Sequence, residues 1–373
     1  MPNPYDPQTP ARPAYFGGRE HVLFKLRERI QMAKEHKKSG GILIYGHRGV
    51  GKTSLINKII NEMSGSDDDP TDILIISRRL ARTTNDQELY RLLTEELIQQ
   101  IEKRKNLIKR IGSFVKNVSS LDAFSLGVEL NKEALEKSPY HQWRNHVESL
   151  GNVGLILIAL DDADWLSLEA IGELKTIVEE SSKIPILLVI SGYIDFEEKL
   201  VDKYSPVARI FSGANFNIGR FNSEETKEVL TKPLSNEKTT WESKAIEKAQ
   251  KITGGYPYLV QCLASACYIE NKTISEDRVT DSIKSAISIG QSWLDHEIPD
   301  ASDQDVISFA KIARLDKNIV QSTEISNAGV SPPYVGRLVK LKILKKMRRG
   351  RYSIEKSPMT ATFELLKREL SLE

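Results

Sequence analysis

The sequence has little of several features that would identify whole classes of protein. It contains only two cysteines, Cys262 and Cys267, and their close spacing fits neither a zinc site nor a disulfide framework. No uninterrupted apolar run reaches the ~18 residues of a membrane span, and no basic-plus-apolar signal begins the chain. The net charge is only +2, so the chain as a whole has no electrostatic mark of nucleic-acid binding. We therefore expect a cytoplasmic protein with no membrane partner, in which any polyanion contact is local.

A glycine-rich segment, Gly46–Thr53, follows the apolar run Ile42–Tyr45 and matches the phosphate-binding pattern G-x-x-x-x-G-K-[ST]. In this pattern glycines let successive N–H groups point at phosphate oxygens, Lys52 neutralises the β/γ charge and the Thr53 hydroxyl ligates magnesium. A strand before the motif and a helix after it are the required context, and the helix dipole faces the phosphates. The pattern predicts a nucleoside triphosphate site made of Gly46, His47, Arg48, Gly49, Val50, Gly51, Lys52, Thr53 and Ser54.

Two carboxylates end the apolar run Leu155–Leu160, which is typical of a strand buried on both faces. Asp161 would hold magnesium and its water, and Asp162 would orient or deprotonate the attacking water. A turn or a helix cap is the alternative, because Asp is common in both. The phosphate loop lies 108 residues earlier, counted from Thr53 to Asp161, and favours metal binding. A carboxylate one methylene shorter than the usual Glu predicts slow turnover.

Three further residues are candidates for catalysis or nucleotide binding, each with an alternative. Ser191 follows an apolar strand pattern and could hydrogen-bond the γ-phosphate or the water, or simply begin a turn. Arg209 could be an arginine finger, a planar cation that stabilises charge in phosphoryl transfer, or an ordinary surface arginine. Pro257, after two glycines, could close a lid helix against the adenine, or only begin that helix.

The order of helical and apolar patterns indicates the fold class. Helical patterns alternate with four apolar runs, as in a parallel sheet flanked by helices: Ile42–Tyr45, Ile73–Ile76, Leu155–Leu160 and Ile184–Ile190. From Phe221 onward only helical patterns appear for about seventy residues, which indicates a helical lid. We therefore predict an α/β P-loop NTPase domain over residues 1–220, a helical lid over 221–295 and a third domain over 296–373.

Three other segments of the predicted α/β domain are an N-terminal arm, a long helix and an insertion. Five prolines within Met1–Tyr15 exclude a helix and favour an extended arm. We expect this arm to wrap the α/β domain. A long helix is predicted from Asp86 to Ile108, and its basic tail is more typical of a solvated face than of a polyanion contact. The insertion over residues 112–135 has only a short alternating stretch, and its role is open.

The third domain begins with a helix-turn-helix pattern: Asp303–Leu315, Ser322–Asn327, a turn at Gly329, and Ser331–Leu344. The alternating segment Leu344–Ile354, with Gly350 at its turn, then indicates a two-stranded wing. The whole resembles a winged-helix domain.

Positive charge is concentrated in this domain. Eight basic and no acidic residues lie between Val335 and Arg351, a concentration that favours contact with duplex DNA. The alternative is a protein-binding or autoinhibitory module whose wing is cationic for solubility. The DNA-binding candidates are Arg337, Lys340, Lys345, Lys346, Arg348, Arg349 and Arg351.

Taken in this order, the motifs resemble those of P-loop ATPases related to AAA+ proteins, in the archaeal-type and STAND-like group that shares an ancestor with origin-recognition initiators. Gly46–Thr53 is similar to that group's Walker A motif, Leu157–Asp162 to its Walker B motif, and the strand ending at Ser191 to sensor 1. The Asn3-Pro4-Tyr5 segment, Pro13 and the Phe16-x-Gly18-Arg19-Glu20 segment resemble its adenine-side motif. Gly254-Gly255-x-Pro257 resembles its lid motif, which replaces the usual sensor 2 arginine.

The resemblance implies an ATPase with ATP and Mg²⁺ as cofactors, whose nucleotide also contacts Phe16, Gly18, Arg19 and Pro257. One function that follows is a switch in which nucleotide state controls DNA binding by the winged helix. The alternative is a STAND-like signalling or defence ATPase whose nucleotide state controls self-assembly or partner binding. Arg209 would then act within one chain or across an oligomer. A metabolic kinase is a weaker third reading, because no small-substrate pocket can be identified.

Overall fold

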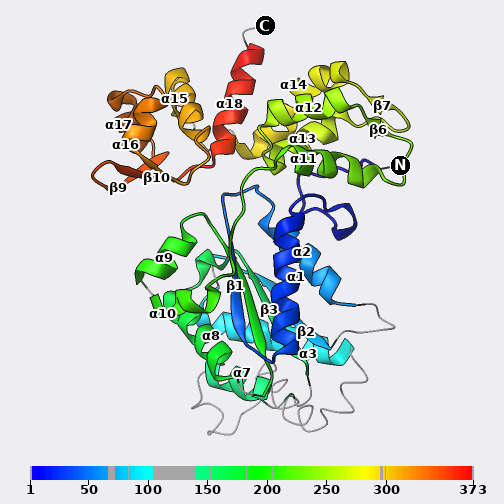
Figure 1. The fold of residues 1–373 in the computed structure, drawn as a ribbon, viewed down its shortest axis with the longest axis vertical. Coiled ribbons are helices and arrows are strands. Elements are labelled where there is room, and N and C mark those ends of the chain that lie inside the picture. The colour runs from blue at the N-terminus through cyan, green and yellow to red at the C-terminus, as the bar shows by residue number, and fades with distance from the viewer. Residues whose placement is uncertain are drawn as a thin grey trace. The chain divides into compact units, whose positions relative to one another are not determined.

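The computed structural model of the chain describes residues 2–65, 72–82, 84–103, 139–148, 150, 153–181, 183–203, 205–294, 297–298 and 300–371. The chain forms two compact units, drawn in Figure 1. The sheet unit comprises residues 20–46 and 55–217, and the helical unit comprises residues 1–19, 47–54 and 218–373. The predicted domain boundaries at residues 220 and 295 stay predictions.

The sheet unit is built on a parallel sheet with the strand order β2-β3-β4-β1-β5. Its strands are β1 (Gly40–Tyr45), β2 (Ile73–Arg79), β3 (Leu155–Asp161), β4 (Ile186–Gly192) and β5 (Asn215–Asn217). The four predicted strands are confirmed. Strand β5 is an addition, since three residues with exposed ends give too short a pattern to recognise. Because the strands are parallel, the carboxyl ends of β1, β3 and β4 lie at one edge of the sheet.

Helices precede or follow these strands. They are α1 (Glu20–Glu35), α2 (Lys52–Met63), α3 (Asp86–Lys103), α7 (Pro139–Glu148), α8 (Leu168–Glu180), α9 (Phe196–Lys203), α10 (Ser205–Ala208) and the short 3-10 helices η2 (Ala163–Trp165) and η3 (Arg209–Phe211). The tail of the predicted helix beyond Lys103 and the predicted insertion over 112–135 lie outside the described residues.

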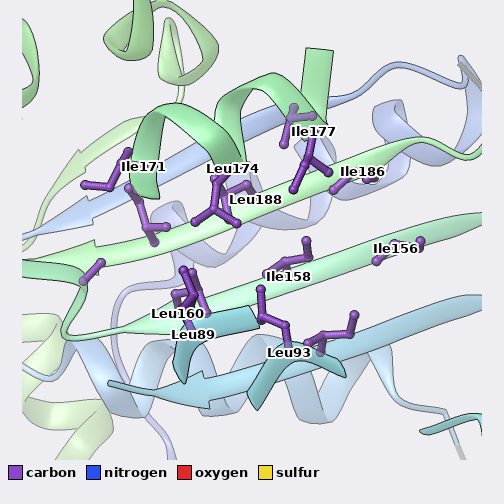
Figure 2. Close-up of a cluster of buried hydrophobic side chains, with 14 of the residues drawn as sticks. Leu89, Leu93, Ile156, Ile158, Leu160, Ile171, Leu174, Ile177, Ile186 and Leu188 are labelled. Carbon is purple, nitrogen blue, oxygen red and sulfur yellow. The ribbon is translucent and has the colours of Figure 1, made fainter. Parts of the chain in front are cut away.

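The core of the sheet unit lies between one face of the sheet and helices α3 and α8 (Figure 2). Alternate residues of β3 and β4 point to this face, because side chains alternate along a strand. The labelled core residues are Leu89 and Leu93 of α3, Ile156, Ile158 and Leu160 of β3, Ile171, Leu174 and Ile177 of α8, and Ile186 and Leu188 of β4. The intervening residues of β3 and β4 are buried too. Burial on both faces explains why these strands appear in the sequence as continuous apolar runs.

The first part of the helical unit is a group of helices that holds the N-terminal arm. Its elements are η1 (Pro13–Tyr15), α11 (Ser223–Thr231), η4 (Lys232–Leu234), β6 (Thr240–Trp241), α12 (Ser243–Thr253), α13 (Pro257–Cys267), β7 (Thr273–Ile274) and α14 (Glu276–Leu294). Tyr5 of the arm is buried in the core of this group. Its hydroxyl donates to the Leu230 carbonyl and accepts from Trp241 Nε1 at 3.0 Å. This part of the arm therefore joins the helical group, which differs from the expected wrapping of the α/β domain.

The second part of the helical unit contains α15 (Asp303–Ala313), β8 (Ile319–Gln321), α16 (Ser322–Asn327), α17 (Pro332–Lys340), β9 (Leu344–Arg348), β10 (Arg351–Ile354) and α18 (Pro358–Ser371). The strands form an antiparallel sheet with the order β8-β10-β9. The predicted helices and the hairpin are confirmed, but α17 ends at Lys340 and not at Leu344. Lys342 adopts a positive φ of 55°, which turns the chain into β9. Strand β8 and helix α18 were not foreseen. No helix in the described part of the chain is long and apolar enough to cross a bilayer.

Candidate functional site

The phosphate loop connects β1 to α2, as the motif requires. Gly49 and Gly51 have φ angles of 78° and 93°, a region that side chains disfavour. A Cβ at Gly51 would meet no atom within 4 Å, so the backbone turn alone accounts for glycine there. Lys52 is the first residue of α2, and its buried Nζ donates to the His47 carbonyl at 3.0 Å. The loop thus forms the curled segment that the sequence predicts.

His47 lies inside this loop and is buried. Burial, helped by the charge of Lys52, lowers the pKa of His47 to about 3. The imidazole is therefore neutral at pH 7. Of His47 and Lys52, it is therefore Lys52 that can offer a positive charge to a phosphate.

Within the helical unit, the phosphate loop is hydrogen-bonded to the start of α13 and to the N-terminal arm. The Gly49 carbonyl accepts from the backbone N–H of Tyr258, in the first turn of α13, at 3.2 Å. The Ser54 hydroxyl accepts from the N–H of Ala11, in the arm, at 3.0 Å. Tyr258 follows Pro257, so the predicted lid motif contacts the phosphate loop through its backbone.

The acidic end of β3 carries the two predicted carboxylates in different settings. Asp161 is buried and accepts a hydrogen bond from the Ser191 hydroxyl. The same hydroxyl accepts from the backbone N–H of Asp162 at 3.2 Å. Ser191, which is fully buried at the end of β4, thus ties both positions together. The predicted contact of Ser191 with a γ-phosphate stays a prediction, and what the structure adds is its bond to Asp161.

Asp162 adopts a left-handed backbone conformation with φ of 56°. Its carboxylate accepts from Nε of Arg79 at 2.9 Å. This bond raises the pKa of Arg79, so the guanidinium stays charged at pH 7. Arg79 ends β2, and the sequence analysis did not single it out. The available signal was its place at the carboxyl end of a buried strand, where functional groups of parallel sheets gather.

The segment predicted to contact adenine is held by helix α11. The N–H groups of Gly18 and Arg19 donate to Glu228 and Glu225 at 3.0 Å each. The Arg19 guanidinium is buried, donates to the Gly219 carbonyl and lies 4.5 Å from the Phe221 ring centroid. Arg19 is therefore engaged by α11 and the chain before it. Phe16, the other side chain of this motif, is buried as well.

Two glycines and a proline form the turn between α12 and α13. Gly254 ends α12 in a left-handed conformation, and Pro257 is the first residue of α13. A Cβ at Gly255 would come within 2.2 Å of the Phe221 carbonyl. Glycine is thus required at residue 255 by close backbone approach, which is a structural reason for part of this motif. The adenine contact of Pro257 stays a prediction.

Arg209 lies in the sheet unit, at the start of η3. Its side chain is 81% exposed, and its Nη2 is 3.9 Å from Glu179 Oε1. An exposed pair at this distance contributes little to stability. Arg209 is therefore not committed to a structural role, and its assignment as an arginine finger stays a prediction.

Magnesium would have to be bound in part by the nucleotide. In the described residues no cluster of three or more His, Cys, Asp or Glu side chains could hold a metal by itself. Mg²⁺ is commonly bound by one or two protein oxygens together with substrate phosphates and water. A buried Asp161, held by Ser191, is a suitable protein ligand of this kind. The role of Thr53 as a magnesium ligand stays a prediction.

The basic residues predicted to bind DNA differ in whether an acidic side chain already binds them. Arg337 of α17 donates two hydrogen bonds to Asp305, at 2.7 and 2.6 Å. Of the predicted DNA contacts, Lys340, Lys345, Lys346, Arg348 and Arg349 are exposed, and Arg351 is half-buried. Within the described residues these six side chains have no ion-pair partner. Arg337 is therefore the one DNA-binding candidate that the structure shows to be occupied.

Residues 15–190 match the family model described as the AAA ATPase domain. This segment contains the phosphate loop and the end of β3. A search among curated proteins finds no match.

Several solved structures are similar to the whole chain. The ORC2 protein of Aeropyrum pernix, determined as ADPNP-ADP complexes, is 13% identical, with a TM-score of 0.54 and coverage of 95% of each chain. A Walker-type ATPase of Pyrococcus abyssi is 16% identical, with a TM-score of 0.52 and coverage of 94% of this chain and 96% of that one. Cdc6p of Pyrobaculum aerophilum is 15% identical, with a TM-score of 0.50 and coverage of 98% and 97%. At these identities the likeness shows the fold, and it confirms the predicted fold class of a parallel sheet flanked by helices.

Proposed function

We propose that the chain is an ATPase switch, which binds and slowly hydrolyses ATP with Mg²⁺ and couples its nucleotide state to duplex DNA. Lys52 would neutralise charge on the β- and γ-phosphates, and Thr53 and Asp161 would hold the magnesium. The bound ion would supply charge neutralisation at the phosphate oxygens. The match of residues 15–190 to the AAA ATPase domain supports this assignment.

In the sheet unit, Ser191 would act by positioning. Its hydroxyl donates to Asp161 and accepts from the Asp162 N–H. These bonds fix the carboxylate of the first residue and the backbone of the second. Asp162 would orient or deprotonate the attacking water, and its bond to Arg79 restrains it in this structure. A short, restrained carboxylate is consistent with slow turnover.

A continuous series of contacts within the helical unit carries the coupling proposal. It begins with the bond from Tyr258 of α13 to the Gly49 carbonyl of the phosphate loop. Helices α13, α14 and α18 then share a buried cluster, called the α18 cluster here: Tyr256, Leu259, Leu294, Met359 and Phe363. Helix α18 also contacts α15. The phosphate loop and the β8-β10-β9 sheet are thus parts of one packed unit, which we interpret as a lid joined to a winged helix.

The first experiment tests nucleotide binding. Lys52→Ala should weaken ATP binding in the presence of Mg²⁺ by about 2 to 3 kcal/mol, or about 30- to 150-fold, because a charge-assisted contact is lost. Titration calorimetry of the folded full chain measures this. Lys58→Ala, six residues further along the same helix and paired with Glu62, is the matched control. Equal affinity of the Lys52→Ala variant and the unaltered chain would refute the assigned site.

A second function is favoured by the exposure of Arg209. An arginine that is 81% exposed and weakly paired could complete a site on another copy of the chain. The chain would then be a STAND-like ATPase whose ATP state drives self-assembly or partner binding. Light scattering after size exclusion, with an ATP analogue, ADP or no nucleotide, and with or without duplex DNA, separates the two functions. Assembly with the ATP analogue alone supports the second, and nucleotide-dependent retention on DNA supports the first.

A further inference from the structure

The exposed face of α17 has few groups that could read bases. In a helix-turn-helix arrangement this is the helix that would enter the major groove. Its exposed residues are Pro332, Pro333, Gly336, Arg337 and Lys340. Residues three or four apart share a face of a helix, so Pro333, Gly336 or Arg337, and Lys340 lie together. Two prolines and a glycine provide no side-chain donor or acceptor.

Arg337 is the residue of this face best suited to base recognition, and it is already engaged. Its Nε and Nη2 donate to the two carboxylate oxygens of Asp305 at 2.7 and 2.6 Å. The Asp305 side chain has no exposed surface. Turning Arg337 toward a base would leave that carboxylate buried without its counter-charge, which is unfavourable. The two donors that would form a bidentate contact with guanine are therefore already bonded to Asp305.

Two exposed polar side chains then remain on or beside this face, fewer than sequence-specific recognition along a binding site uses. Lys340 is exposed at the last turn of α17. Ser331 precedes the helix, and a serine hydroxyl suits either kind of base or a phosphate. Sequence-specific recognition uses several side chains of the Arg, Asn and Gln type at base edges. Arg337 is the one residue of this type on α17, and it is already bound to Asp305.

The free positive charge lies instead beyond α17, on a surface that we call the cationic hairpin, comprising β9, its turn at Gly350, and β10. Lys345, Lys346, Arg348 and Arg349 are exposed there, and Arg351 is half-buried. Strand β9 lies at an edge of the sheet. Lysine at an edge also blocks pairing between sheets of different molecules. The size of the cluster, with no acidic residue within it, favours a polyanion over this protective role.

We propose that the chain binds duplex DNA through phosphate contacts of the cationic hairpin, with no preference for sequence. This inference rests on the DNA-binding function proposed above and adds the class of substrate, which is duplex DNA of any sequence. Contacts to phosphates position a protein on the duplex and carry no sequence information. The hairpin and Lys340 supply about six such contacts, so log affinity should fall with log salt at a slope of roughly −5.

The test measures the affinity of the full chain, with Mg²⁺ and an ATP analogue, for AT-rich, GC-rich and mixed duplexes of equal length. We expect dissociation constants that agree within about threefold, since one good base contact alone gives about fivefold or more. The double variant Lys345→Ala/Lys346→Ala should reduce the steepness of the salt dependence by about 2 on every duplex. Lys272→Ala/Lys284→Ala removes the same charge from two exposed lysines of the helical group and should leave the slope unchanged.

The outcomes are distinguishable. A preference of more than about fivefold for one duplex, the least that a single base contact contributes, would overturn the inference and leave DNA binding intact. An unchanged slope in the hairpin variant would show that the contacts lie elsewhere. Failure to bind any duplex, with ATP binding retained, would overturn the DNA-binding function itself and this inference with it.

Discussion

The pair Asp305–Arg337 allows a quantitative prediction, because its two members differ greatly in exposure. The Asp305 side chain has no exposed surface, whereas that of Arg337 is 52% exposed. Asp305 also accepts from the N–H and the hydroxyl of Ser302, at 3.0 and 2.6 Å, at the start of α15. Replacing Arg337 by methionine would therefore leave a buried carboxylate with Ser302 as its remaining partner.

The expected loss of stability in the Arg337→Met variant follows from the burial of Asp305. Removing one member of a buried ion pair costs about 3 to 5 kcal/mol, because the other charge stays uncompensated. Adding Asp305→Asn to Arg337→Met removes the charge and keeps an oxygen to accept from Ser302. The double variant should then be destabilised by only about 1 to 2 kcal/mol, the net worth of the lost hydrogen bonds. The second substitution is thus predicted to restore about 2 kcal/mol.

Hydrogen exchange of the backbone amides of α15 and α17, measured in the full chain, reports the stability of these helices in each variant.

The Asp305–Arg337 pair also makes the stability of this region depend on pH. Arg337 and Ser302 hold the pKa of Asp305 well below its usual range, so its stabilisation is present above the unfolded pKa of about 4 and is lost as pH falls through the folded pKa. Asp305→Asn should remove that acid sensitivity. A double variant no more stable than Arg337→Met would refute the argument from a stranded charge.

Three further predictions concern the candidate site and the arm. Asp162→Asn should retain ATP binding and lower single-turnover hydrolysis by about a hundredfold, the lower end for a lost general base; unchanged turnover would remove its assigned role. Arg79→Ala should raise turnover by at most about fivefold, because an exposed pair restrains Asp162 by no more than about 1 kcal/mol; a fall would give Arg79 a direct role. Tyr5→Phe leaves the buried Trp241 N–H unpaired and should cost about 1 to 3 kcal/mol in thermal unfolding, which an unchanged transition would contradict.

The sequence predicted those elements whose pattern is continuous over several residues. Strands β1 to β4 were recognisable because burial on both faces leaves an uninterrupted apolar run. Strands β5 and β8 span three residues each, too few for any pattern to be read. The predicted helix over Ser331–Leu344 was too long, because the left-handed Lys342 that ends it is a lysine, which gives no turn signal of the kind that glycine gives.

At the candidate site, sequence motifs identified the residues but not their partners, which are distant in the sequence. Arg79 and Asp162 are 83 positions apart, and Ser191 reaches Asp161 across 30. Such contacts depend on the strand order, which periodicity does not determine. The arm shows the same limit, since its five prolines indicate an extended chain and say nothing of the Trp241 side chain that Tyr5 meets.

The contacts of α13 indicate where a nucleotide could act on the rest of the helical unit. The first N–H groups of a helix have no partner within it, and that of Tyr258 is satisfied by the Gly49 carbonyl of the phosphate loop. A change in the loop would therefore alter the start of α13 directly. The α18 cluster packs this helix against α14 and α18, and close-packed interiors transmit displacement because they have few voids. A ligand shifts an equilibrium only through differential affinity. The Gly49–Tyr258 bond is therefore one contact within the helical unit through which ATP and ADP could act differently.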